Sequence, residues 1–142
     1  IKTGEMVFIN AGHESILTFD QNKNYEYIKS EMPPIGIVKY FSESMVKSNT
    51  INMKDKTFVV YTDGVTEGYL QNGEELGSEG VQNIINNISE VTPKAIVESI
   101  EKKLNWGAEK LRDDITCMAI NIKNTELIKK KPVEKSKKVE GK

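Results

Sequence analysis

The sequence has 142 residues, of which 37% are hydrophobic and 29% are charged. These values are typical of one soluble globular domain, and no apolar run approaches the ~18 residues that a membrane-spanning helix needs. The formal net charge of -1 conceals an asymmetry, because residues 123–142 hold eight lysines and three glutamates whereas residues 1–122 are acidic. An acidic body argues against a nucleic-acid partner, and nothing in the segment predicts a membrane contact. The single Cys117 excludes an internal disulfide and favours a reducing, cytoplasmic compartment.

Short runs of strand-forming residues dominate the first third of the chain. Glu5–Ala11 and Ser15–Phe19 are separated by Gly-His-Glu, which predicts two strands joined in a hairpin. Asn22–Asn24 predicts a further turn, and Met32–Gly36 predicts a loop because proline lacks the N–H that a central strand must donate. Tyr40–Ile51 alternates polar and apolar residues, which predicts an exposed pair of strands.

Two later segments are apolar and have the composition of strands. Thr57–Thr62 is a continuous run of β-branched and aromatic residues, which predicts a central strand. Ile115–Ile122 is a similar apolar run and predicts the last strand. Residues 123–142 have no periodic apolar pattern. We therefore expect a domain over residues 1–122, followed by a basic, disordered tail over residues 123–142.

Two amphipathic helices are predicted between these strands. The first should begin with Ser78 as its N-cap, and the second with Thr92, followed by Pro93 at a position where its missing N–H costs nothing. Strands, two adjacent helices and a final strand predict an α+β fold with helices layered on antiparallel sheets. The apolar stripes that should face a sheet are Val81, Ile84, Ile85 and Ile88 in the first helix and Ile96, Ile100 and Leu104 in the second.

Acidic residues stand at the ends of these two predicted apolar strands. Asp63-Gly64 follows the first, and Asp113-Asp114 precedes the last. If the strands are antiparallel neighbours, three carboxylates meet at one edge, where a divalent cation would relieve their repulsion. Oxygen ligands favour Mg²⁺ or Mn²⁺ over Zn²⁺. Ordinary turn chemistry accounts for the same residues, and spacing alone favours that simpler interpretation.

His13 and Glu67 have simple structural interpretations by themselves. His13 is the only histidine, so the sequence supports neither a zinc cluster nor Ser-His-Asp catalysis. Glu67 lies four residues after Asp63, and a solvated carboxylate near a loop explains it.

Four motifs occur in an order that identifies a family. They are Asn10–Glu14 (Asn-Ala-Gly-His-Glu), Pro34–Ile37 (Pro-Ile-Gly-Ile), Val60–Glu67 (Val-Tyr-Thr-Asp-Gly-Val-Thr-Glu) and Asp113–Thr116 (Asp-Asp-Ile-Thr). This series resembles the PP2C-like metal-dependent serine/threonine phosphatases, in particular their bacterial sporulation stage II E branch. Each motif is short, but the ordered set is specific. The likeness extends from about Met6 to Ile122.

The resemblance implies a particular fold and metal centre. The fold would be an antiparallel β-sandwich flanked by helices in four layers (αββα), with two Mn²⁺ or Mg²⁺ ions at one end of the sheets. Asp63 and Asp113 would be metal ligands, and Asp114 would lie in or directly behind the ligand set. Gly64 would place its backbone near the metals. The remaining motif residues would lie on the substrate side: Asn10, His13 and Glu67.

The resemblance also implies the reaction, which is hydrolysis of phosphoserine or phosphothreonine by water held between two cations. The substrate would be a phosphorylated regulatory protein such as an anti-sigma-factor antagonist, in bacterial signal transduction. The family's bridging ligand comes from a Gly-Asp-hydrophobic-aromatic-Asp segment that these 142 residues do not contain. We therefore expect the first part of the catalytic domain to be missing, and the chain alone to be inactive and prone to dimerise. The alternative is a non-catalytic PP2C-like interaction module in a signalling protein.

Overall fold

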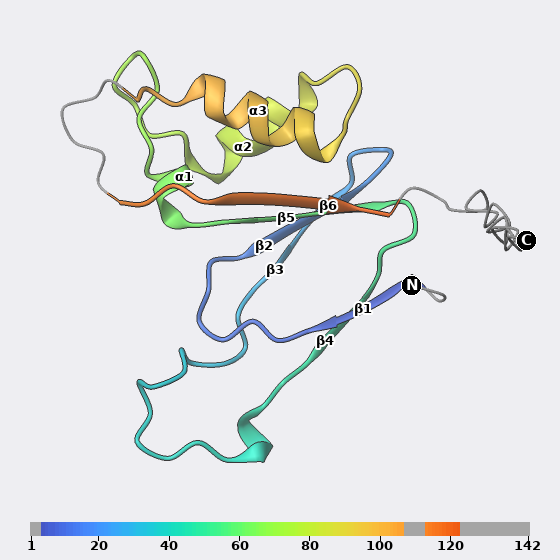
Figure 1. Cartoon of the computed structure of the whole chain (residues 1–142), viewed down its shortest axis with the longest axis vertical. Coiled ribbons are helices and arrows are strands. Elements are labelled where there is room, and N and C mark those ends of the chain that lie inside the picture. Colours follow the sequence, from blue (N-terminus) through green and yellow to red (C-terminus); the bar gives the residue numbers. More distant parts are fainter. Residues whose placement is uncertain (1–3, 107–112, 123–142) are drawn as a thin grey trace, which may run out of the picture.

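The computed structural model of the chain describes residues 4–106 and 113–122 (Figure 1). The described elements, in chain order, are β1 (Glu5–Phe8), β2 (Ile16–Asp20), β3 (Tyr25–Ile28), the 3-10 helix η1 (Glu43–Met45), β4 (Asn49–Asn52), β5 (Lys56–Tyr61), α1 (Asp63–Thr66), α2 (Gly77–Asn86), α3 (Pro93–Lys103) and β6 (Cys117–Asn121). None of these helices is long and apolar enough to span a membrane. The tail predicted for residues 123–142 lies outside the described residues.

The strands form two antiparallel sheets. One has four strands in the order β3-β2-β5-β6, and the other pairs β1 with β4. Helices α2 and α3 cover one face of the four-stranded sheet, and the β1-β4 pair lies on its other side (Figure 1). The α+β class and the antiparallel sandwich predicted from the sequence are thus confirmed. The described residues supply three of the four predicted layers.

Successive side chains of the central strands point to opposite faces of the sheet, and two separate apolar cores result. On β5, Val59 and Tyr61 face the helices, whereas Phe58 faces the two-stranded sheet and meets Phe8 edge to face with ring centroids 5.3 Å apart. The helix-side core is the larger one, and all but one of the predicted helix-stripe residues are buried in it. It consists of Leu17, Phe19, Val59, Tyr61, Val65, Leu76, Val81, Ile84, Ile85, Ile96, Ile100 and Leu104.

Of the two helices predicted from the sequence, α3 begins as predicted and α2 does not. The Thr92 hydroxyl accepts the Ala95 N–H at 3.1 Å, and Pro93 occupies the first turn of α3. Helix α2 instead begins at Gly77, one residue before the predicted cap, and Leu76 precedes it without a side-chain cap. The prediction that Ser78 caps α2 is therefore wrong.

Two strand predictions are also wrong. Glu5–Ala11 and Ser15–Phe19 do not form a hairpin, because β1 pairs with β4 while β2 pairs with β3 and β5. The true hairpin is β2-β3, closed at the predicted Asn22–Asn24 turn. Within Tyr40–Ile51 only the last three residues belong to a strand, β4, and the preceding residues form a loop with η1.

Antiparallel pairing brings several strand ends to one end of the sandwich. In the four-stranded sheet Ile16 at the start of β2 pairs with Ile28 at the end of β3, and Tyr61 at the end of β5 pairs with Cys117 at the start of β6. Strand β1 ends and β4 begins on the same side (Figure 1). We call this side the motif end, because all four sequence motifs begin or finish there.

Candidate functional site

The end of β5 is joined to the start of β6 by a short hydrogen-bond network. The Thr62 N–H donates to the Thr116 carbonyl at 3.0 Å. The Thr62 hydroxyl donates to the Asp114 carbonyl at 2.9 Å and accepts the Thr116 N–H at 3.0 Å. Thr62, which directly precedes Asp63, therefore holds the segment before β6 against the end of β5. The sequence motif contained Thr62, but no pattern indicated this role.

Gly64 allows the two acidic segments to touch. A Cβ atom built on Gly64 would lie 2.5 Å from the Asp114 carbonyl oxygen and 3.4 Å from that of Asp113. Such a contact is too close for any side chain, so the backbone at the start of α1 packs directly on the backbone of Asp113 and Asp114, chiefly on the Asp114 carbonyl group. The sequence analysis expected Asp63 to lie beside Asp113 and Asp114 if the two strands were antiparallel neighbours. Strands β5 and β6 are such neighbours, and the arrangement agrees with that expectation.

The carboxylates themselves make local contacts. Asp63 Oδ1 accepts the Gly64 N–H at 2.9 Å, and Asp113 Oδ1 accepts the Asp114 N–H at 2.7 Å. All three acidic residues are exposed. These side-chain hydrogen bonds between described residues use one oxygen of Asp63 and one of Asp113. Asp63 and Gly64 are the first two residues of helix α1, so a helix and not a simple Asp-Gly turn follows β5.

A buried asparagine organises the Asn-Ala-Gly-His-Glu motif. Asn10 is only 3% exposed; its side-chain amide donates to the Glu14 carbonyl at 3.2 Å and its oxygen accepts the His13 N–H at 2.9 Å. His13 is exposed, and its Nδ1 lies 3.2 Å from the Glu14 carbonyl. Asn10 thus shapes the turn, while His13 is the motif residue that faces solvent.

The first two motifs pack on one another. Gly12 has a φ of +78°, and a Cβ atom on it would lie 2.1 Å from Cγ of Pro34. The Ser30 hydroxyl accepts the Gly12 N–H at 2.7 Å and lies 2.9 Å from the Asn10 carbonyl. Only glycine fits between the turn and the proline ring. Ser30 lies outside every motif, so sequence reasoning missed it.

Burial behind the motif end perturbs two weak acids. Burial, reinforced by the neighbouring Tyr27, raises the pKa of Tyr61 to about 12, and Glu14 acts in the same direction. Burial alone raises the pKa of the Cys117 thiol to about 11. Both groups are therefore neutral near pH 7, and Cys117 lacks the thiolate character of a nucleophile. Glu67 lies exposed just after α1, where its N–H donates to the Asp63 carbonyl at 2.7 Å.

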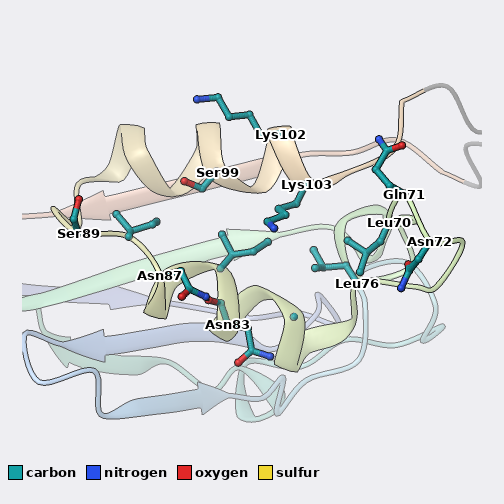
Figure 2. A pocket seen from close by; sticks show the side chains of 13 residues that line it. Leu70, Gln71, Asn72, Leu76, Asn83, Asn87, Ser89, Ser99, Lys102 and Lys103 are labelled. Atoms are coloured by element: carbon teal, nitrogen blue, oxygen red, sulfur yellow. The ribbon is translucent and has the colours of Figure 1, made fainter.

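A separate groove lies on the helical layer. It has a volume of about 940 Å³ between α2, α3 and the loop that contains Leu70 (Figure 2). Its apolar lining comes from Leu70, Leu76, Ile84 and Ile88, and none of the predicted site residues contributes to it. This groove is distinct from the motif end.

Asp63, Asp113 and Asp114 offer only oxygen donors, the kind that Mg²⁺ and Mn²⁺ prefer, and the missing Cβ of Gly64 lets the two acidic segments come together. Within residues 4–106 and 113–122, no three side chains of His, Cys, Asp and Glu are grouped closely enough to hold a metal ion by themselves. The metal-ligand roles of Asp63, Asp113 and Asp114 stay a prediction.

Solved structures with the same fold are phosphatase domains. The SiaA-PP2C domain of Pseudomonas aeruginosa is 18% identical, with a TM-score of 0.63 over 86% of this chain and 48% of that one. The structure of the RsbU and RsbW domains of Rv1364c from Mycobacterium tuberculosis is 19% identical, with a TM-score of 0.60 over 84% and 33%. The phosphatase domain of SpoIIE from Bacillus subtilis, presoaked with Mn, is 16% identical, with a TM-score of 0.54 over 83% and 55%. These likenesses define a PP2C-like fold.

The family follows from the sequence itself. The family model described as Stage II sporulation protein E (SpoIIE) matches residues 1–123, so the chain belongs to the SpoIIE family of PP2C-like phosphatase domains. A comparison with curated proteins gave no match. The chain spans between 33% and 55% of the three solved chains named above.

Proposed function

We propose that the protein carrying this chain hydrolyses phosphoserine or phosphothreonine esters on a regulatory protein, in a reaction that depends on Mn²⁺ or Mg²⁺. The observation that carries the proposal is the contact between the start of α1 at Asp63-Gly64 and the backbone of Asp113 and Asp114 at the motif end. Two acidic segments far apart in sequence are held together there, and family membership supports a phosphatase-type activity.

The chain's own residues have distinct roles in this proposal. Asp63 and Asp113 supply metal ligands, Asp114 lies in or behind the ligand set, and the Gly64 backbone gives the segments room to approach. Thr62 fixes the distance between them. Asn10 shapes the turn that presents His13 on the substrate side, and Glu67 lies there too. When bound, the cations lower the pKa of water and neutralise charge on the phosphoryl oxygens.

The proposed substrate is a phosphorylated anti-sigma-factor antagonist, and the proposed setting is the bacterial cytoplasm. The fold likeness to the RsbU and SpoIIE domains supports regulation of this kind. The metal centre needs a bridging ligand that the motifs in these 142 residues do not supply. We therefore infer that the chain alone lacks turnover and tends to dimerise through its exposed strand edges.

The test is the loss of activity on removing a single negative charge. In the intact protein, Asp63→Asn and Asp113→Asn should each lower Mn²⁺-dependent kcat/KM for a phosphoserine peptide by at least ~100-fold, because even residues that only support metal ligands are worth ~10–100-fold. Asp114→Asn should be milder. Circular dichroism should show an unchanged fold.

Asp55→Asn is the matched control. This variant makes the same Asp-to-Asn change in an exposed residue at the opposite end of β5. Asparagine also tolerates the φ of +60° that Asp55 adopts. Its activity should stay normal. Normal activity in both the Asp63 and Asp113 variants would refute the proposal, whereas partner binding without turnover in the unmodified protein would establish the interaction-module alternative.

A further inference from the structure

A small group of polar side chains lies behind the end of β5, where β3, β5 and α2 meet. The Tyr27 hydroxyl on β3 accepts the Gln82 side-chain N–H at 2.9 Å and donates to the Ser78 carbonyl at 3.3 Å. Tyr61 on β5 is only 2% exposed, and burial is the main cause of its raised pKa. The side chains of Tyr27 and Ser78 are also hydrogen-bond partners of its hydroxyl. We call Tyr27, Tyr61, Ser78 and Gln82 the tyrosine cluster.

Two short routes connect the tyrosine cluster to Asp63. Along the chain, Tyr61 is followed directly by Thr62 and then by Asp63. Through space, the Leu76 N–H at the start of α2 donates to the Gly68 carbonyl at 2.9 Å, just after α1 ends. Helix α1 has only four residues and begins with Asp63. Both ends of this short helix are therefore attached to elements that the tyrosine cluster joins.

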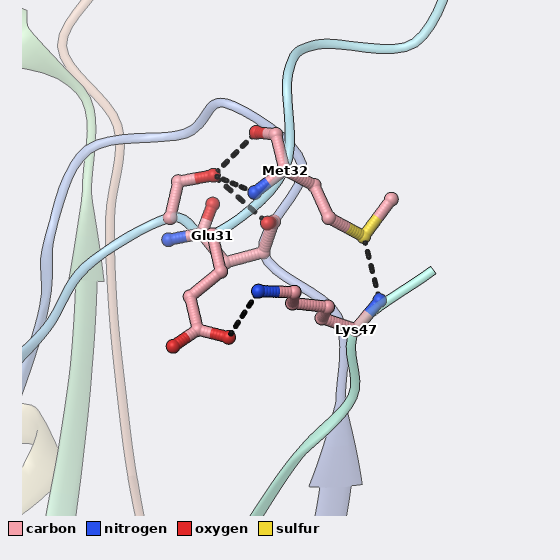
Figure 3. Close-up of polar contacts among 5 residues, drawn as sticks. Glu31, Met32 and Lys47 are labelled. Atoms are coloured by element: carbon pink, nitrogen blue, oxygen red, sulfur yellow. Dashed lines mark hydrogen bonds and ion pairs between the residues drawn. The ribbon is translucent and has the colours of Figure 1, made fainter. Parts of the chain in front are cut away.

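Strand β3, which carries Tyr27, is a firm support for these contacts. It pairs with β2 along its whole length. Just beyond its end, the Ser30 hydroxyl lies 2.7 Å from the Met32 carbonyl and 2.9 Å from the Asn10 carbonyl, and the Lys47 N–H donates to Met32 Sδ at 3.1 Å (Figure 3). The motif end of β3 is thus tied to two other segments of the chain.

We propose that Tyr27 is a positioning residue for the candidate metal site. Its hydroxyl holds the first turn of α2 against Tyr61 and thereby fixes the place of Asp63 at the motif end. Metal ligands bind a cation well only when the groups behind them hold them in place, so loss of this support should weaken metal binding. The inference rests on the proposed function, because it requires that Asp63 binds Mn²⁺ or Mg²⁺.

Tyr25 provides a matched control on the same strand. Its hydroxyl donates to Asn86 Oδ1 at 2.8 Å, at the C-terminal end of α2. Tyr25→Phe and Tyr27→Phe therefore each remove one hydroxyl that links β3 to α2. Tyr25 pairs with Phe19 away from the motif end, whereas Tyr27 lies beside Tyr61.

The experiment follows α1 without metal and then Mn²⁺ binding without substrate, both in the intact protein. Hydrogen exchange in the peptide that contains residues 62–68 reports how readily α1 opens. Electron paramagnetic resonance of free Mn²⁺ gives the dissociation constant. Thermal unfolding checks that both variants are folded and have lost similar stability.

Tyr27→Phe should speed exchange in α1 by ~3-fold or more and raise the Mn²⁺ dissociation constant by ~5-fold or more. The second change is smaller than the ~10–100-fold effect of groups that contact a metal ligand directly, because Tyr27 acts through Tyr61. Tyr25→Phe should leave both quantities within ~2-fold. The double variant Tyr27→Phe/Tyr61→Phe should bind Mn²⁺ as Tyr61→Phe does, because hydroxyls of one network do not act additively.

Three results would overturn the positioning role. Equal exchange in Tyr27→Phe and Tyr25→Phe would indicate a general loosening of α2. An unchanged Mn²⁺ dissociation constant in Tyr27→Phe would separate the tyrosine cluster from the metal site, and additive effects in the double variant would show that the two tyrosines act independently. In these cases the unmodified protein still binds Mn²⁺ and the proposed function stands. If the unmodified protein binds no Mn²⁺, the proposed function fails and the inference fails with it.

Discussion

A methyl group at Gly64 should separate the two acidic segments. In Gly64→Ala the new Cβ would lie 2.5 Å from the Asp114 carbonyl oxygen and 3.0 Å from its carbon. Both atoms belong to the backbone, so no side chain can rotate away. Since ordinary contacts begin near 3.4 Å, the segments must move apart by about 1 Å. Forced packing of this kind costs ~1–3 kcal/mol, and a ~1 Å displacement at a reacting site can cost ~100-fold in rate.

The assay is Mn²⁺-dependent hydrolysis of a phosphoserine peptide by the intact protein, together with thermal unfolding. We expect kcat/KM to fall by ~100-fold and the melting temperature by several degrees. Gly80→Ala is the control: Gly80 lies inside α2, where alanine favours the helix by ~1 kcal/mol, and its Cβ would lie 2.5 Å from Cδ1 of Leu76, a side-chain atom that can shift where a backbone atom cannot. Full activity and stability in Gly64→Ala would refute the close contact between the segments.

Three further predictions concern individual hydrogen bonds and one thiol. Thr62→Val removes the hydroxyl that bridges Asp114 and Thr116, so kcat should fall ~10-fold or more while the fold, measured by circular dichroism, persists; an unchanged kcat would contradict the positioning role. Lys23→Met removes the ammonium that donates to the Asn86 carbonyl at 2.8 Å at the end of α2, and urea unfolding should show a loss of ~1 kcal/mol. Because burial raises the pKa of Cys117 from 9.0 to about 11, the folded state keeps a proton that the unfolded chain loses, and stability should decline as pH rises through that range. Iodoacetamide at pH 8 should accordingly react slowly until urea unfolds the chain, and equal rates would contradict this burial.

Continuous and periodic apolar patterns predicted the central part of the fold. The β-branched run at Thr57–Thr62 predicted the central strand β5. The four-residue spacing of Ile96, Ile100 and Leu104 predicted the buried face of α3, which Thr92 caps. These features depend on local sequence and on burial, which a periodic pattern reports directly.

The partners of short strands were beyond the reach of the sequence. Glu5–Phe8 pairs with Asn49–Asn52, more than forty residues away, although a strand beside it in sequence was available. The turn built on Asn10 and the positive φ of Gly12 carries the chain from one sheet to the other instead of closing a hairpin. Such long-range choices depend on packing that no local pattern contains.

The contact between the two acidic segments was predicted from the sequence, but the residues that hold them together were not. The acidic positions at the ends of two strands indicated that Asp63 and Asp113-Asp114 would be neighbours, and the antiparallel β5-β6 pair agrees with that reasoning. The bridging hydroxyl of Thr62 and the support of Ser30 were not predicted, because threonine and serine are common in turns and their partners are distant in sequence. The metal-ligand roles stay predictions.

The most direct test of the central claim is to locate Mn²⁺ in crystals of the intact protein by anomalous diffraction. The proposal predicts Mn²⁺ peaks at the motif end, with carboxylate oxygens of Asp63 and Asp113 within ~2.5 Å, and their loss in Asp63→Asn crystals. Peaks at other positions, or none at the motif end in crystals soaked with millimolar Mn²⁺, would contradict the assignment.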